Sequence, residues 1–246
     1  MLGKLIGVGV GPGDPGLVTL KAYEAIRTAD VICAPKARPE KTSMALEAVK
    51  PLLKRMEGFP EVLELVFPMV KDKLMLERAW RKNAETIIAE LKKGKTVVFI
   101  TLGDPMFYST FIYVYRSIVE AYPELNVEVV PGVTSMTACA AASKMPIAEA
   151  DDAVAVLPAS LDSAKVYEIA RHVDTLIFIK GVKNLSVLTE TLLKGGFTAD
   201  SPIVMVKKHG GLAEEIKAGT LKDLRSWRVE DYFSTIIVKK RAKNAE

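Results

Sequence analysis

The chain has 246 residues, enough for one to two domains at roughly 150 residues each. Hydrophobic residues make up 49% and charged residues 26%, which excludes a disordered, fibrous or disulfide-scaffold protein. The 34 basic and 30 acidic residues leave a net charge of +4. This excess is too small to indicate a protein that coats nucleic acid, and it is compatible with an anionic small-molecule substrate.

Cysteine and histidine usage argues against a metal centre. Cys33 and Cys139 each lie in an apolar stretch, and His172 and His209 are far apart in the sequence. We therefore expect buried thiols and no metal site. No apolar run reaches the ~18 residues of a membrane span, and glycines interrupt the N-terminal apolar segment. These features predict a cytoplasmic protein that binds no membrane.

The first part of the chain alternates short β-branched runs with longer amphipathic ones. This pattern is typical of a parallel α/β sheet. Strands are predicted over 5–10, 30–34, 62–66, 96–102 and 127–130, and helices over 17–28, 43–54, 74–93, 111–122 and 134–143.

The alternation resumes after a stretch that has the composition of a linker. Residues 145–152 contain Pro146 and three acidic residues. Beyond them, strands are predicted over 153–157, 176–180, 203–207 and 233–239, with helices between. The sequence thus predicts an α/β protein of two lobes, 1–148 and 149–246.

Ligands of open α/β sheets bind beyond the carboxyl ends of the strands, and the loop after the first predicted strand is rich in glycine. Gly11, Gly13 and Gly16 satisfy the dinucleotide pattern G-x-G-x-x-G. However, Pro12 and Pro15 remove backbone N–H groups that a phosphate-binding turn needs. An NAD-dependent dehydrogenase therefore remains only an alternative interpretation.

Two later loops have the same character. Gly103-Asp104-Pro105 ends a buried-type strand, and Asp104 there is suited equally to binding a ligand and to capping the next helix. Pro131-Gly132-Val133-Thr134-Ser135 precedes an alanine-rich helix. The sequence contains no Ser-His-Asp set, paired-carboxylate motif or H-E-x-x-H motif. These loops favour a reaction whose cofactor and substrate supply the reactivity.

The three loops together make the chain resemble the tetrapyrrole methylases, two-lobed enzymes that use S-adenosylmethionine in a cleft between the lobes. Within that family it is most similar to the precorrin-2 or cobalt-factor II C(20)-methyltransferases of cobalamin synthesis. The uroporphyrinogen methylases match less well, since Tyr108-Ser109-Thr110 replaces their Gly-Arg-Gly. The supporting segments are Gly7–Asp14, Gly13–Ala22, Phe67-Pro68-Met69, Gly103–Thr110 with Tyr113, Pro131–Met136, Ile179–Asn184 and Tyr232–Val238.

The resemblance implies a set of cofactor-binding residues and a type of chemistry. Asp104 and Tyr108 are the candidates for assisting proton loss from the C(20) bridge. The glycine-rich Lys207–Gly211 departs from the family pattern. The implied S-adenosylmethionine contacts are Val10, Gly11, Pro12, Gly103, Asp104, Phe107, Thr134, Ser135, Lys180, the Ile203–Val206 strand end, Ser234 and Thr235.

The resemblance also implies a substrate with many carboxylates and a homodimeric enzyme. Trp80 and Phe107 are candidates for stacking on the macrocycle, although Trp80 lies on a helical stripe that favours a core position. Alternatives are another tetrapyrrole specificity, such as uroporphyrinogen III or precorrin-4, and the dehydrogenase. The candidates for binding substrate carboxylates are Lys21, Lys36, Arg38, Arg78, Arg81, Lys180 and Lys183.

Overall fold

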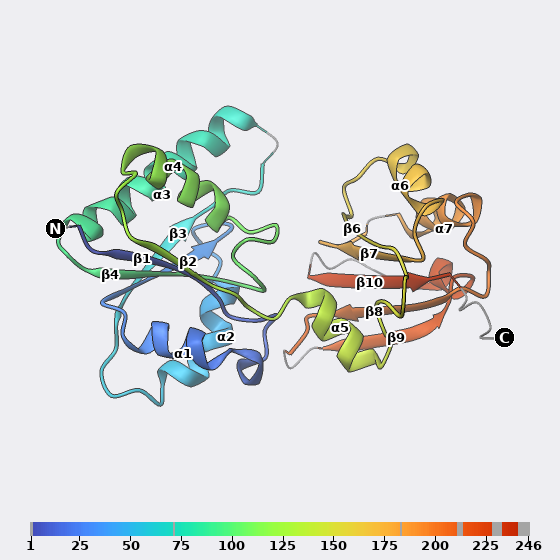
Figure 1. Cartoon of the computed structure of the whole chain (residues 1–246), viewed down its shortest axis with the longest axis horizontal. Helices are drawn as coiled ribbons and strands as arrows, with labels where there is room; N and C mark the ends of the chain where they lie inside the picture. The colour runs from blue at the N-terminus through green and yellow to red at the C-terminus, as the bar shows by residue number, and fades with distance from the viewer. Residues whose placement is uncertain (1, 71, 183, 211–213, 228–232, 241–246) are drawn as a thin grey trace. The chain divides into compact units, whose positions relative to one another are not determined.

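Each half of the chain builds its own five-stranded sheet with helices on both faces (Figure 1). The computed structural model describes residues 2–70, 72–182, 184–210, 214–227 and 233–240. They divide into two units, Met1–Thr134 and Ser135–Glu246. Helix α5 (Ser135–Ser143) groups with the second unit because it packs on that unit's sheet. The predicted α/β class is confirmed, while the lobe boundary near residue 148 stays a prediction.

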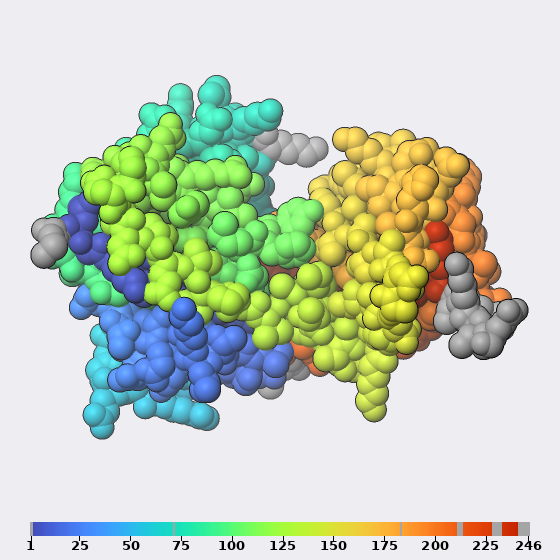
Figure 2. All heavy atoms as spheres, in the orientation of Figure 1, coloured from blue at the N-terminus to red at the C-terminus, as the bar shows by residue number. Residues whose placement is uncertain are grey.

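The first unit is a parallel sheet, as the sequence predicts. Its strands are ordered β3-β2-β4-β1-β5, and each neighbouring pair is parallel. Helices α1 and α2 cover one face of this sheet, and α3 and α4 cover the other (Figure 1). In the space-filling view of Figure 2, the blue atoms of the first of these two sides lie below the teal and green atoms of the second. The elements are β1 (Lys4–Gly9), η1 (Pro15–Leu17), α1 (Leu20–Arg27), β2 (Val31–Lys36), α2 (Met44–Leu53), β3 (Glu61–Val66), α3 (Lys73–Lys92), β4 (Thr96–Thr101), α4 (Phe111–Ala121) and β5 (Val127–Val130).

Strand alternation explains why this sheet carries two hydrophobic cores. Successive side chains of a strand point to opposite faces. Leu5 and Val97 therefore join the core beneath α3 and α4, whereas Ile6 and Val98 join the core on the α1 and α2 side. Because helices cover both faces of this sheet, the side chains on both sides of a central strand are buried, and its sequence is nearly continuously apolar.

The second unit has a mixed sheet of order β6-β7-β10-β8-β9. β6 and β7 are parallel, but β10 runs antiparallel to both of its neighbours, β7 and β8. β9 is not among the strands predicted from the sequence; it pairs antiparallel with β8. The elements are β6 (Val154–Pro158), α6 (Ser163–Ala170), β7 (Thr175–Ile179), α7 (Leu185–Lys194), β8 (Pro202–Lys207), β9 (Glu215–Thr220), η2 (Asp223–Ser226) and β10 (Ser234–Lys239).

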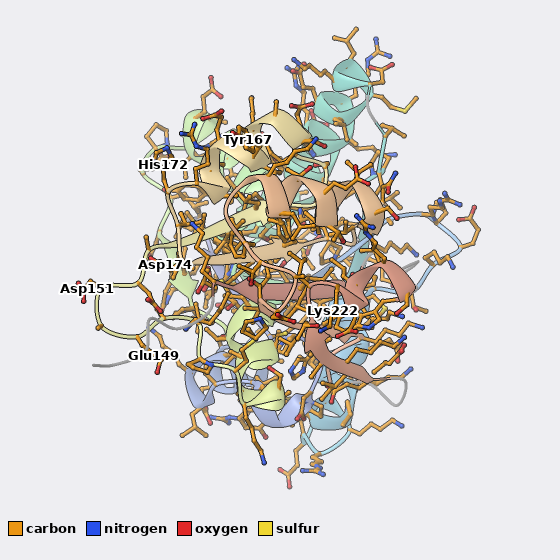
Figure 3. The ribbon with its side chains drawn as sticks, turned by 90° about the vertical axis from the view of Figure 1, so that its right-hand side faces the viewer. Glu149, Asp151, Tyr167, His172, Asp174 and Lys222 are labelled. Atoms are coloured by element: carbon orange, nitrogen blue, oxygen red, sulfur yellow. The ribbon has the colours of Figure 1, made fainter. Side chains whose placement is uncertain are left out.

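The cysteines behave as the sequence predicts. Cys33 and Cys139 are buried and free, and burial raises the pKa of each thiol to about 12. In the described residues no three His, Cys, Asp or Glu side chains gather as metal ligands. Glu149, His172 and Asp174, for example, lie apart along one side of the second unit (Figure 3). No helix in the described part is long and apolar enough to cross a membrane.

An ion-pair cluster ties the first strand of the sheet to its edge strand. Glu128 accepts from Lys4 and Lys21, each at 2.7 Å, and these hydrogen bonds lower the pKa of its carboxyl to about 2. A lowered folded-state pKa stabilises the fold above the unfolded pKa, and this stability is lost as the pH falls toward 2. Glu128→Gln should therefore be less stable at pH 7 by up to about 1 kcal/mol, since the lysines are partly exposed.

Urea unfolding of wild type and Glu128→Gln between pH 7 and pH 2.5 checks this expectation. The difference in unfolding free energy should shrink steadily below pH 5. A difference that stays constant across this range would contradict it.

Candidate functional site

The loops after β1 and β4 are joined by their backbones. β1 and β4 are neighbours in a parallel sheet, so their carboxyl ends lie at the same edge. The Val10 N–H donates to the Thr101 carbonyl at 2.9 Å, and the Gly103 N–H donates to the Gly11 carbonyl at 2.8 Å. These bonds extend the pairing beyond the strands and fix the two loops against each other.

Asp104 joins the loop after β5 to this pair. Its Oδ2 accepts from the Gly132 N–H at 3.0 Å, and its Oδ1 accepts from the Met106 N–H at 2.8 Å. Both carboxylate oxygens therefore bind backbone amides of two different loops. The sequence suggests that Asp104 binds a ligand or caps the next helix. The structure shows a further role, because the Asp104 side chain holds the loop after β5, which is distant in the sequence.

Glycines permit the close approach of the three loops. A Cβ on Gly132 would lie 2.1 Å from the Gly103 carbonyl oxygen, and one on Gly9 would lie 2.6 Å from the Gly132 nitrogen. Gly103 is different, because its φ is +67° and a Cβ there would meet no atom within 4 Å. Its backbone therefore borders open space, where a ligand can approach it closely.

The residues after Gly103 and Asp104 place two aromatic rings beside this loop. Phe107 is half-buried and Tyr108 is exposed, and their rings pack edge to face at 5.0 Å. Tyr108 has a φ of +53°, an uncommon conformation for a bulky residue. Buried Ser109 supports the loop, since its hydroxyl donates to the Thr101 Oγ1 and accepts from the Phe111 N–H. The sequence pattern contains no signal that singles out the Ser109–Thr101 bond.

In the second unit, the predicted residues gather at one edge of the sheet. The Thr235 hydroxyl donates to the Ser135 Oγ at 3.1 Å, which joins β10 to α5. Thr235 pairs with Ile179 of β7 and Val206 of β8, so Lys180 and the end of β8 lie at the same edge. Ser234 and Thr235 are buried. The structure thus brings together Ser135, Lys180, the end of β8, Ser234 and Thr235; Thr134 ends the first unit.

Lys180 has two unusual properties at this edge. Its φ is +69°, which is costly for a residue with a Cβ, and desolvation lowers the pKa of its ammonium group. Backbone strain of this kind is concentrated at binding sites. The strained backbone and the desolvated ammonium group make Lys180 a candidate ligand-binding residue.

Two of the other predicted basic residues are already ion-paired. Lys21 binds Glu128, and Lys36 binds Glu64 at 3.0 Å, so these two charges are already paired. Arg38, Arg78 and Arg81 are exposed, and Lys183 lies outside the described residues, as does Tyr232. The core position favoured for Trp80 is confirmed, since Trp80 packs against the core beneath α3 and α4.

The glycine pattern of the first loop does not lead into a helix. The Asp14 Oδ1 accepts from the Gly16 N–H at 2.8 Å, and Pro15–Leu17 forms a short 3-10 turn. The helix itself begins at Leu20. In a dinucleotide site the last glycine packs at the start of the helix that binds the pyrophosphate. This geometry removes the main support for the dehydrogenase interpretation.

Comparison with known proteins identifies the family of the chain. The sequence pattern of the tetrapyrrole (corrin/porphyrin) methylases matches residues 4–225. A Methanocaldococcus jannaschii protein named a probable cobalt-precorrin-2 C(20)-methyltransferase is 36% identical, over 96% of both chains. A Salmonella typhimurium protein named cobalt-precorrin-2 C(20)-methyltransferase is 33% identical, over 100% of both.

Solved structures share the fold. A cobalt precorrin-4 methyltransferase superposes with a TM-score of 0.73 at 23% identity, over 96% of this chain and 94% of the other. A uroporphyrin-III C-methyltransferase from Thermus thermophilus, complexed with S-adenosyl homocysteine, gives 0.70 at 23% identity, over 96% and 92%. Because the family pattern matches residues 4–225 and relatives of this family are 33–36% identical over almost the whole chain, the protein belongs to the tetrapyrrole (corrin/porphyrin) methylases.

Proposed function

We propose that this chain transfers a methyl group from S-adenosylmethionine to C(20) of precorrin-2 or cobalt-factor II in cobalamin biosynthesis. The observation that carries the proposal is the similarity to two relatives named for C(20) methylation, at 33–36% identity over 96–100% of the chain. A Sinorhizobium relative named precorrin-2 C(20)-methyltransferase, 31% identical over 79% of the chain, supports the same position on the ring. Its name lacks cobalt, so the proposal includes both forms of the substrate.

The joined loops have the chemistry needed to hold this cofactor. Bound S-adenosylmethionine supplies an already activated methyl group, so the protein must mainly hold the two reactants in line. Such positioning can lower a barrier by roughly 7–11 kcal/mol. The accessible Gly103 backbone fits a cofactor held by main-chain groups. We propose as its contacts Val10, Gly11, Pro12, Gly103, Asp104, Phe107, Thr134, Ser135, Lys180, Ser234 and Thr235.

The two proposed catalytic residues differ in their surroundings. Both oxygens of Asp104 already accept from backbone amides, so we assign Asp104 to positioning the cofactor loops. Tyr108 is 45% exposed and belongs to the same loop. We keep Tyr108 as the residue that assists proton loss from the C(20) bridge.

The proposal includes a cytoplasmic homodimer that acts on a small anionic tetrapyrrole. Methylation of uroporphyrinogen III or precorrin-4 is the alternative specificity, because solved enzymes of those kinds share the fold. At 23% identity that likeness supports the fold alone, so C(20) transfer is preferred.

Incubation of the purified protein with methyl-labelled S-adenosylmethionine and each tetrapyrrole tests the proposal. Precorrin-2, cobalt-factor II, uroporphyrinogen III and precorrin-4 are assayed in parallel, and the label is located by NMR. Label at C(20) of either of the first two supports the proposal. Label on another carbon, or transfer only to the last two, overturns it. Thermal stabilisation by NAD rather than by S-adenosyl homocysteine would restore the dehydrogenase.

A substitution of Lys180 should change the stability of the fold and the affinity for the cofactor in opposite directions. Lys180→Gly removes the Cβ from a position with a φ of +69°, which should relieve about 1 kcal/mol of strain. The same change removes the ammonium group, so we expect about fivefold weaker binding of S-adenosyl homocysteine, the size of one hydrogen bond. Thermal unfolding and calorimetry check the two effects. A lower melting temperature, or unchanged affinity, would contradict this role of Lys180.

A further inference from the structure

Exposed apolar side chains gather at the carboxyl edge of the first sheet, on the side of α3 and α4. In a parallel sheet the loops that follow the strands all lie at the carboxyl edge. The loops after β3 and β4 therefore lie there, together with the first turns of α3 and α4, into which these loops lead. These segments hold seven large exposed apolar side chains: Met69, Val70, Leu74, Met75, Met106, Tyr108 and Tyr113. An exposed group of this kind on a globular protein marks a binding surface.

Tyr113 is the member of this group that stacks on a core-packed aromatic ring. Its ring stacks on Trp80 with centroids 4.0 Å apart and planes 2° apart. Trp80 is held in turn by the core beneath α3 and α4, so the position of the tyrosine ring is fixed. Tyr113 nevertheless remains 40% exposed. One ring face lies against the tryptophan, and the exposure comes from the opposite face and the edge.

One exposed arginine shares the helix face of Tyr113. Arg116 lies three residues further along α4, and such a spacing places two side chains on the same helix face. Arg78 and Arg81 also belong to α3, but they lie two residues before and one residue after Trp80, spacings that do not place side chains on one helix face. All three guanidinium groups are exposed, and among the described residues no ion pair involves Arg78, Arg81 or Arg116. Glu77 lies three residues before Trp80 and shares its helix face, so Arg116 is the one of these arginines that the helix spacing places beside Tyr113.

A flat, exposed aromatic ring beside an arginine suits a flat, apolar ligand with a carboxylate at its rim. Aromatic groups stack in offset parallel geometry with a gain of about 0.5–1.5 kcal/mol beyond area burial, and arginine binds carboxylates through its planar fork. Tyr113 lies in the first turn of the helix that follows the Gly103–Asp104 loop. A ligand on its ring is therefore held next to a loop that is proposed to bind the cofactor.

We propose that the exposed face of Tyr113, supported by Trp80, is the stacking platform for the substrate macrocycle, and that Arg116 binds one of its carboxylates. This inference rests on the proposed function for the class of substrate. The proposed ligand of this surface is a small molecule and not a second copy of the chain.

Direct binding tests the platform without turnover. Visible-absorption titration measures the Kd of precorrin-2 and cobalt-factor II for protein saturated with S-adenosyl homocysteine. Tyr113→Ala should weaken tetrapyrrole binding about tenfold, Tyr113→Phe should stay within about twofold of wild type, and Arg116→Glu should weaken binding most at low salt. The Kd of S-adenosyl homocysteine should not change in any of them.

Tyr167→Ala is the matched control. Tyr167 on α6 lies in the second unit (Figure 3) and also has an arginine beside its ring, with the Arg171 guanidinium carbon 5.8 Å from the ring centroid. Its replacement should leave both dissociation constants unchanged. An unchanged tetrapyrrole Kd in Tyr113→Ala overturns the platform, as does a dimer that dissociates in this variant without weaker tetrapyrrole binding.

The two hypotheses fail in different ways. If the wild type binds a tetrapyrrole and Tyr113→Ala binds it less tightly, but no label reaches C(20), then the proposed reaction is wrong and the platform stands. If the label reaches C(20) and the tetrapyrrole Kd of Tyr113→Ala is unchanged, then the proposed reaction stands and the platform is wrong. A wild type that binds neither tetrapyrrole overturns both.

Discussion

Gly132→Ala should weaken binding of S-adenosyl homocysteine at least tenfold and destabilise the first unit. The added Cβ would lie 2.1 Å from the Gly103 carbonyl oxygen and 2.7 Å from the Gly9 backbone. Backbone atoms cannot rotate away as a side chain can, so the three loops must separate. We expect a loss of about 3 kcal/mol in unfolding free energy, the upper end of overpacking costs, and at least a tenfold rise in the Kd.

Gly58→Ala is the control for the loss of a glycine. Gly58 has a φ of +84°, and a Cβ there would have no atom within 4 Å, so the change costs strain of about 1 kcal/mol without a clash. Urea denaturation and calorimetry compare the two variants. If Gly132→Ala binds S-adenosyl homocysteine as the wild type does, the close packing of the loops is not what forms the cofactor site.

Asp104→Ala should lower kcat/KM for S-adenosylmethionine roughly 100-fold, mainly through weaker binding. The change leaves the Gly132 and Met106 amides without their acceptor. Hydrogen bonds to a charged group contribute about 1.5–3 kcal/mol each, and about 2.7 kcal/mol corresponds to a factor of 100 in affinity. Loss of the bond to Gly132 frees the third loop from the other two.

Asp104→Asn separates positioning from proton transfer. The amide retains one acceptor oxygen, so binding should recover partly, to between the alanine variant and wild type. A residue that took the proton would show the opposite pattern, with a normal Kd and a kcat as low in Asn as in Ala. Asp162→Ala, which removes a single cap on α6, should cost about 1 kcal/mol of stability and leave the Kd unchanged.

The elements of the first unit are largely predictable because local pattern and tertiary environment agree there. Its strands are short apolar runs between glycine- or proline-containing loops, and β4, α4 and β5 begin at the expected residue. β9 escapes prediction because Glu215, Lys217 and Gly219 are uncommon in strands. It forms because β8 offers it a pairing edge, a tertiary cause that no local pattern records.

The sequence predicts which loops form the candidate site, but it does not predict the contacts between their residues. Glycine and proline punctuation identifies the segments after β1, β4 and β5. The double acceptor role of Asp104 depends on Gly132, which is 28 residues away, and one carboxylate is suited to many partners. The stack of Tyr113 on Trp80 likewise needs the packing of α3 on α4, so the periodicity of each helix alone cannot reveal it.

The order of strands in the first sheet has a consequence for synthesis of the protein. β1 is made first, yet its two neighbours are β4 and β5, so Leu5 pairs with Val97 and Val127. At about 5–20 residues per second, the ribosome delivers β5 many seconds after β1. Until β4 has been made, the apolar first strand has no partner on either side, and from then until β5 is made it has only one. Non-local pairing is also slow. The first sheet therefore cannot be completed until β5 has emerged, and the exposed first strand can bind a chaperone during that time.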